Sequence, residues 1–140
     1  NVRFRPVFLG RRPAEPVDHD LVAFYGRLLK ETDRDVFRSG EWRLCERSGW
    51  PDNQSHLNLV AWCWRKDDNR YLIVVNLSGA SAQALVRIPW DDVKGKSWQL
   101  VDVFSGDVYE RNGDEMQEQG LYVDLPGWEY HFVQFKRGRK

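Results

Sequence analysis

Residues Leu57 to Ser78 read LNLVAWCWRKDDNRYLIVVNLS, and this stretch decides the fold. In its first half, alternate residues from Val60 to Trp64 are large and apolar, so an extended chain places them on one face. The second half, Tyr71–Val75, is apolar on both faces and rich in β-branched residues, which is typical of a central strand. A buried helix is the competing interpretation, and the shortness of the run argues against it. The pattern predicts an antiparallel hairpin at the middle of a β-sandwich.

The composition limits the partners of this chain. Its 140 residues are enough for one domain, or for one domain with an extension. The 21 basic and 21 acidic residues balance, so no basic excess draws the chain to nucleic acid or to an anionic membrane. Neither a secretory signal nor an apolar span of membrane length is present. The chain begins with Asn1, so we expect a longer parent, and a bacterial cytoplasmic location is favoured.

An amphipathic helix is predicted near the N-terminus. Residues Asn1–Pro16 contain three prolines and no period, which indicates an irregular lead-in. The next segment can be capped by Asp18 or His19. Its apolar residues follow the i, i+3, i+4, i+7, i+8 pattern of a helix with one apolar face; they are Leu21, Phe24, Tyr25, Leu28 and Leu29. We therefore expect residues 1–35 to form a lead-in and a helix whose apolar face needs a partner.

Short strands dominate the rest of the chain. Between residues 36 and 136, alternating apolar segments are separated by turn signals such as Asn112–Gly113 and Pro126–Gly127. The signals recur about every ten residues, a spacing typical of antiparallel sandwiches and barrels. The prediction is an all-β sandwich of about eight antiparallel strands over residues 36–136, with residues 137–140 as a tail.

The cysteines and histidines show no metal-site pattern. Cys45 and Cys63 lie in apolar, strand-like segments, and we interpret them as two buried free thiols. A disulfide would require neighbouring strands with suitable geometry. His19, His56 and His131 are isolated, and no paired cysteine or histidine spacing supports a metal. We expect no metal and no cofactor.

Five stretches, in this order, resemble the C-terminal part of α-amylase family glycoside hydrolases. The first is similar to the loop and final helix of that family's (β/α)8 barrel, and the others to its C-terminal β domain. They are PVFLGRRPAEPVDHDLVAFYGRLL (Pro6–Leu29), FRSGEWRL (Phe37–Leu44), RYLIVVNLSG (Arg70–Gly79), WQLVDVFSGDVY (Trp98–Tyr109) and LYVDLPGWEYHFVQF (Leu121–Phe135).

The resemblance implies a Greek-key β-sandwich beside a catalytic barrel, in a parent that hydrolyses or transfers α-glucosidic bonds. The family's catalytic carboxylates sit on barrel strands, and no position here matches those motifs. A carboxylate pair would have to lie about 5 Å apart in a retaining enzyme, whereas the candidates occupy solvated turns. They are Asp91, Asp92, Asp107, Asp114 and Glu115. We expect a non-catalytic domain that packs on the barrel. If no barrel is present, the helix is expected to pack on its own sandwich or on a second copy of the chain.

A carbohydrate-binding module is the alternative function. Trp50, Trp90 and Trp128 stand beside proline or glycine turns, where exposed rings could stack on glucose units of an α-glucan. Hydrogen bonds to hydroxyl groups could come from three neighbours: Asp52, Asn53 and Asp91. The competing interpretation is that these rings plug the ends of the sandwich or face the barrel. The strand tryptophans are expected to be core or half-buried; they are Trp42, Trp62 and Trp64.

Overall fold

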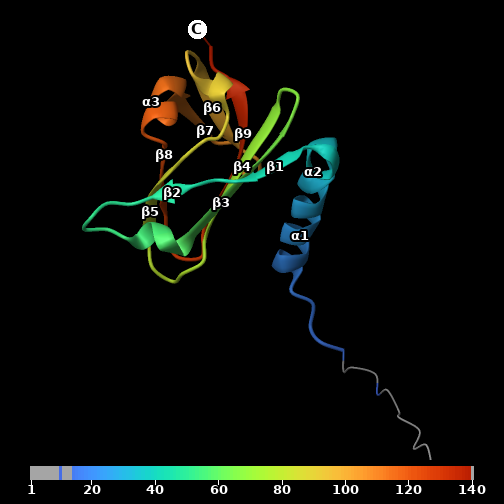
Figure 1. The fold of residues 1–140 in the computed structure, drawn as a ribbon. Coiled ribbons are helices and arrows are strands. Elements are labelled where there is room, and N and C mark those ends of the chain that lie inside the picture. The colour runs from blue at the N-terminus through green and yellow to red at the C-terminus, as the bar shows by residue number, and fades with distance from the viewer. Residues whose placement is uncertain (1–9, 11–13, 140) are drawn as a thin grey trace, which may run out of the picture.

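The computed structural model describes Gly10 and residues 14–139, which form a two-layer antiparallel β-sandwich with a helix beside it (Figure 1). The predicted lead-in falls mostly on residues 1–9 and 11–13, outside the described part. The strands are β1 (Glu41–Leu44), β2 (Arg47–Ser48), β3 (Leu59–Lys66), β4 (Asn69–Asn76), β5 (Ala82–Val86), β6 (Ser97–Asp102), β7 (Val108–Asn112), β8 (Leu121–Leu125) and β9 (Tyr130–Arg137). The predicted all-β sandwich is confirmed.

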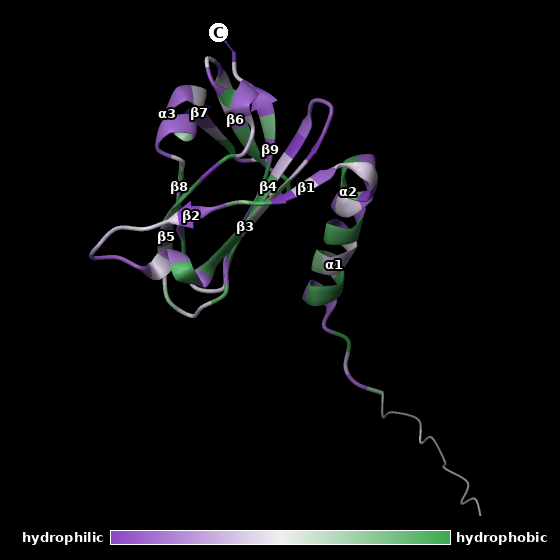
Figure 2. Cartoon of the chain, in the orientation of Figure 1, coloured by the Kyte–Doolittle hydropathy of each residue, from purple (hydrophilic) through white to green (hydrophobic). Residues whose placement is uncertain are grey.

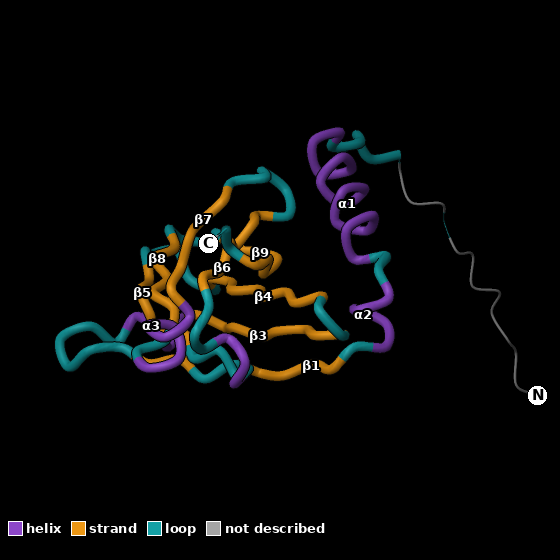
Figure 3. The backbone as a smooth tube through the Cα atoms, turned by 90° about the horizontal axis from the view of Figure 1, so that it is seen from above, coloured by secondary structure: helices purple, strands orange, loops and turns teal. Residues whose placement is uncertain are grey.

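The strands divide between two sheets of unequal size. One sheet has six strands in the order β1-β3-β4-β9-β6-β7, and the other has three in the order β2-β5-β8. Because β9 lies between β4 and β6 while β5 and β8 belong to the other sheet, connections cross between the layers as in a Greek key. Seen from above, α1 stands to one side of this sandwich (Figure 3).

The helices are α1 (His19–Thr32), α2 (Asp35–Ser39) and α3 (Gly113–Glu118), with 3₁₀ turns η1 (Ser55–Asn58) and η2 (Asp91–Val93). Of the two predicted capping residues, Asp18 is the one that caps α1. Its carboxylate accepts a hydrogen bond from the backbone N–H of Leu21 at 3.0 Å. None of the helices in the described residues is long and apolar enough to cross a membrane.

The interpretation of Asn112–Gly113 as a simple turn was wrong. The Asn112 side chain accepts hydrogen bonds from the backbone N–H groups of Asp114 and Glu115, so it caps the short helix α3. Asparagine favours turns and helix N-caps for the same reason, its short acceptor side chain. The helix is kept because Met116 is buried in the core.

The central hairpin is where the sequence predicts it. Strands β3 and β4 pair with Trp62 opposite Ile73 and Trp64 opposite Tyr71, and β9 covers the other edge of β4. The inner residues of β3 alternate with half-buried outer ones, whereas β4 is mostly buried on both faces. Strand β4 is therefore the centre of the larger sheet.

Asn76 closes the C-terminal end of β4 inside the protein. Its amide nitrogen donates hydrogen bonds to the carbonyl oxygens of Ala80 at 2.8 Å, Leu125 at 3.1 Å and Pro126 at 3.0 Å. Its amide oxygen accepts from the backbone N–H of Ser78 at 3.0 Å. One buried side chain thus joins β4 to the loop that follows it and to the end of β8.

We expect Asn76→Ala to lower the free energy of unfolding by about 3 kcal/mol, because it leaves several buried carbonyl groups without a donor. Urea denaturation followed by circular dichroism measures this loss. Asn69→Ala, at the exposed start of the same strand, serves as the control and should change stability by less than about 0.5 kcal/mol. Equal stability of the two variants would contradict the bridging role.

Candidate functional site

The three tryptophans proposed to bind sugar do not form one surface. Trp90 is only 5% exposed, and its ring packs edge-on against Phe135 at 5.3 Å, so it offers no face to a ligand. Trp128 is 70% exposed in the turn between β8 and β9, beside Gly79. Trp50 lies half-buried against Tyr122, with ring centroids 6.1 Å apart. The inclusion of Trp90 is therefore corrected, because the η2 segment turns this ring into the core.

Helix α1 contacts the sandwich through only part of its apolar face. Leu28 packs with a cluster on the outer side of the six-stranded sheet, and Phe24 meets Phe104 at 5.8 Å and Tyr130 at 6.2 Å. No residue of α1 is buried. The remaining apolar residues of the helix are exposed; they are Leu21, Val22, Tyr25 and Leu29.

The outer side of the six-stranded sheet continues this apolar surface. A row of large side chains crosses four strands in register, from Leu44 through Trp62 and Ile73 to Phe132. Leu44 and its strand neighbour Trp42 are exposed, whereas Phe132 is buried beneath the helices. The expectation that Trp42 is core or half-buried was therefore wrong, because β1 is the edge strand of the sheet. Figure 2 shows hydrophobic residues along α1, which stands beside this sheet. We call the combined surface the outer apolar face; its exposed members are Leu21, Phe24, Tyr25, Leu29, Trp42 and Leu44.

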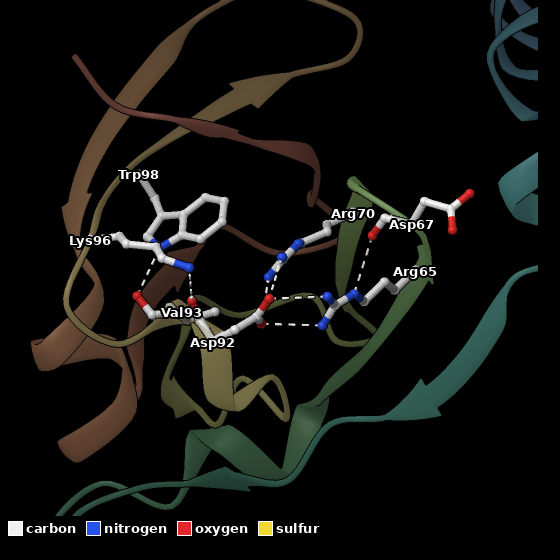
Figure 4. A network of polar contacts seen from close by, with 7 residues as sticks. All are labelled: Arg65, Asp67, Arg70, Asp92, Val93, Lys96 and Trp98. Atoms are coloured by element: carbon white, nitrogen blue, oxygen red, sulfur yellow. Dashed lines mark hydrogen bonds and ion pairs between the residues drawn. The ribbon is translucent and has the colours of Figure 1, made fainter.

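A polar network lies at the turn end of the central hairpin, where Asp92 sits between two arginines (Figure 4). Its carboxylate accepts hydrogen bonds from Arg65 at 3.1 and 3.0 Å and from Arg70 at 2.8 and 2.6 Å. Arg70 is buried, and its guanidinium lies 4.9 Å from the centre of the Trp98 ring. The hydrogen bonds from Arg70 lower the pKa of Asp92 from its ordinary 3.8 to about 2.

This network is built for stability rather than catalysis. A carboxylate held ionised by two arginines is a poor proton donor at neutral pH. Lys96 donates a hydrogen bond to the backbone oxygen of Asp92, and the Trp98 indole N–H donates one to the backbone oxygen of Val93. These bonds hold η2 against the start of β6. The pairing of Arg70 with Asp92 was not predicted, because the two residues are far apart in sequence and each reads locally as part of a turn.

The two thiols and His131 are at least partly buried. Cys45 and Cys63 are free and buried, as predicted. The hydrogen bond to Cys63, with burial, raises the pKa of Cys45 and keeps that thiol protonated. Burial lowers the pKa of His131, which faces the space between the sheets. Among the described residues, no group of three histidine, cysteine or acidic side chains is placed to hold a metal ion.

A mixed polar and aromatic hollow lies on the outer side of the three-stranded sheet. It has a volume of about 410 Å³ and is lined by Trp50, Asp52, Asn53, Gln83, Tyr122 and Asp124. The structure brings together three residues that the sequence selected (Trp50, Asp52 and Asn53) with three that it did not. The sequence signal that could have pointed to Tyr122 and Asp124 is the alternation in β8, which places both side chains on its outward face.

Comparison with known proteins identifies the fold. No family model matches the chain, and no curated protein matches it in sequence. Solved structures match its fold. A noncanonic maltogenic α-amylase, AmyB from Thermotoga neapolitana, superposes with a TM-score of 0.67 over 89% of this chain at 14% identity. An α-amylase from Geobacillus thermoleovorans gives 0.62 over 87% at 12% identity, and the trehalulose synthase MutB from Pseudomonas mesoacidophila MX-45 gives 0.51 over 81% at 16% identity.

These matches confirm the resemblance to the α-amylase family at the level of the fold. The chain spans only 27% of AmyB, 24% of the Geobacillus enzyme and 17% of MutB. The matched enzymes are therefore much longer than this chain, and its fold corresponds to a minor part of each.

We expect Asp92→Asn to lower the free energy of unfolding at neutral pH by about 2 kcal/mol, because Arg70 keeps its burial but loses its counter-charge. The folded-state pKa of Asp92 is depressed, so its ionic contribution is present above about pH 4 and is lost as the pH falls from there to about 2. That contribution is about 1 kcal/mol after allowance for solvent screening, since 39% of the side chain is exposed.

Urea titrations at several pH values measure the effect. The difference between wild type and Asp92→Asn should shrink through this acid range, whereas the exposed neighbour Asp91→Asn should match wild type throughout. A constant difference down to about pH 2 would show that the charge of Asp92 is not involved.

Proposed function

We propose that this chain is the non-catalytic β domain of an α-amylase family glycosidase, and that it packs on the catalytic barrel through the outer apolar face. The observation that carries the proposal is the division of apolar surface in this protein. The apolar residues between the sheets are buried as one cluster, while a second apolar surface on α1 and β1 remains exposed.

The exposure of α1 argues for a covering partner. A helix of 14 residues gains most of its stability from packing its apolar face. In this chain Leu29 is 67% exposed, and Leu21 and Tyr25 are also exposed. Covering each such side chain is worth about 1.5–3 kcal/mol, and a patch of this kind marks an interaction site.

The structural matches support a catalytic barrel as the partner. The α-amylase structures that share this fold are about four times as long as the matched segment, so in those proteins it is accompanied by a much larger remainder. In our proposal α1 is the last helix of the barrel, and residues 36–136 are the sandwich domain. The outer apolar face, which both contribute to, is the surface that packs on the rest of the barrel. The parent would act on α-glucosidic bonds, and this domain would stabilise and orient its catalytic neighbour.

Two of the five candidate carboxylates support a non-catalytic role. Asp92 is held ionised by Arg65 and Arg70. Asp114 accepts a hydrogen bond from the backbone N–H of Gly95 and so supports a loop. Both side chains serve local structure, and the reacting groups of the parent would lie on the barrel.

The test places a charge in the proposed interface. In the full parent enzyme, Leu29→Glu should lower the melting temperature by about 5 °C or more, because it buries a carboxylate against apolar surface. In the 140-residue chain alone the same change should alter the free energy of unfolding by less than about 0.5 kcal/mol, since the position is solvated there.

The control is Leu57→Glu, a leucine of η1 with nearly equal exposure (64%) that lies outside the outer apolar face. It should leave the melting temperature of the parent unchanged. An upstream reading frame that encodes no glycosidase barrel would overturn the proposal, as would equal effects of the two substitutions in the parent.

A further inference from the structure

The hollow on the three-stranded sheet lies on the opposite layer of the sandwich from the outer apolar face, and the packing role does not use it. Its volume of about 410 Å³ falls in the range of small-molecule sites. We propose that this hollow binds a neutral oligosaccharide by ring stacking and hydrogen bonding. The choice of an α-glucan as that sugar rests on the proposed function.

Two aromatic rings form the apolar part of the hollow. Trp50 and Tyr122 meet edge to face, with centroids 6.1 Å apart and planes at 62°. Tyr122 projects outward from β8, and this large aromatic side chain is exposed to solvent. The flat face of a pyranose carries C–H groups that pack on such rings, and each aromatic side chain also offers a polar edge.

A chain of hydrogen bonds forms the polar part. The amide nitrogen of Asn53 donates to the side-chain oxygen of Gln83 at 2.8 Å, and the amide nitrogen of Gln83 donates to Asp124 at 2.8 Å. Gln83 and Asp124 stand directly opposite each other on β5 and β8. Each of these bonds uses only one of the two N–H groups of its amide, so both amides and Asp124 keep capacity for a ligand.

The loop that carries Trp50 is held rigidly. Trp50 and Asn53 exchange two backbone hydrogen bonds of 3.0 Å around Pro51–Asp52. The Asn53 side chain accepts from the backbone N–H of Ser55 at 3.0 Å, and the Ser55 hydroxyl accepts from the backbone N–H of Gln83 at 2.9 Å. Because the loop is already fixed on β5, little conformational freedom is left to be lost on binding.

The lining of the hollow favours a neutral ligand with many hydroxyl groups. Asp52 and Asp124 would repel an anion, and no basic side chain lines this hollow. Carboxylates and amides beside aromatic rings match the alternating donors and apolar faces of a sugar. A cationic ligand is the competing class, because acidic and aromatic groups also attract cations.

A second cavity lies next to the hollow, at the edge of β8. It has a volume of about 330 Å³, shares Tyr122 and Asp124 with the hollow, and continues past Tyr109, Arg111 and His131. Its lining also includes the buried residues Leu72, Val74 and Val133, so this cavity lies between the sheets, whereas the hollow lies on the outer side of the smaller sheet.

Titration of the 140-residue chain with maltoheptaose, followed by tryptophan fluorescence and by NMR, tests the proposal. Binding is expected in about the millimolar range, as for a shallow, open site. Trp50→Ala and Tyr122→Ala should each weaken it about tenfold or more. Trp128→Ala removes a more exposed ring outside the hollow and should leave the affinity unchanged.

Circular dichroism tests whether each variant is folded. If Trp50→Ala does not fold, the Tyr122→Ala variant alone decides the test. Absence of binding by the intact chain overturns the proposal, as does affinity retained in the folded Tyr122→Ala variant. Binding of a lysine-rich peptide that is lost at high salt, without sugar binding, would assign the hollow to cations and also overturn it. None of these results bears on the packing role, which the melting temperature of the Leu29→Glu parent tests separately.

Discussion

Strand β4 is buried on both faces, and the polar side chains at its two ends must find partners inside the protein. Arg70 near the start of the strand is buried and pairs with Asp92, while Asn76 at the end bonds three carbonyl oxygens. A buried charge or amide without such partners costs several kcal/mol. The η2 segment and the β8–β9 turn are therefore held against β4, and Asn76 also joins the larger sheet to β8 of the smaller one.

The two layers of the sandwich differ in what their outer surfaces present. The six-stranded sheet carries large apolar side chains outward, and α1 extends that surface. The three-stranded sheet instead carries a network of amides and carboxylates beside two rings. Apolar area without polar groups favours permanent protein contacts, whereas fixed polar groups next to rings favour a reversible ligand. One small domain thus offers surfaces for two different kinds of interaction.

The elements that were correctly predicted have strong local signals. The spacing of Leu21, Phe24 and Leu28 indicates a helix with one apolar face, and the run Tyr71–Val75 indicates a strand covered on both sides. By contrast, Asn112–Gly113 is compatible with a turn and with a helix cap. Burial of Met116 selected the helix, and a local pattern does not contain that information.

By itself, the sequence determined the fold class, the helix with its unsatisfied apolar face and the burial of both cysteines, because each depends on the order of apolar and polar residues along a short segment. Only the tertiary structure decided which tryptophans are available to a ligand. Trp90 and Trp50 both stand beside a proline, yet one lies in the core and the other against Tyr122. Residues distant along the chain become neighbours through strand pairing, as Gln83 does with Asp124, and the hollow exists only because the β5–β8 register and the loop carrying Trp50 bring these side chains together.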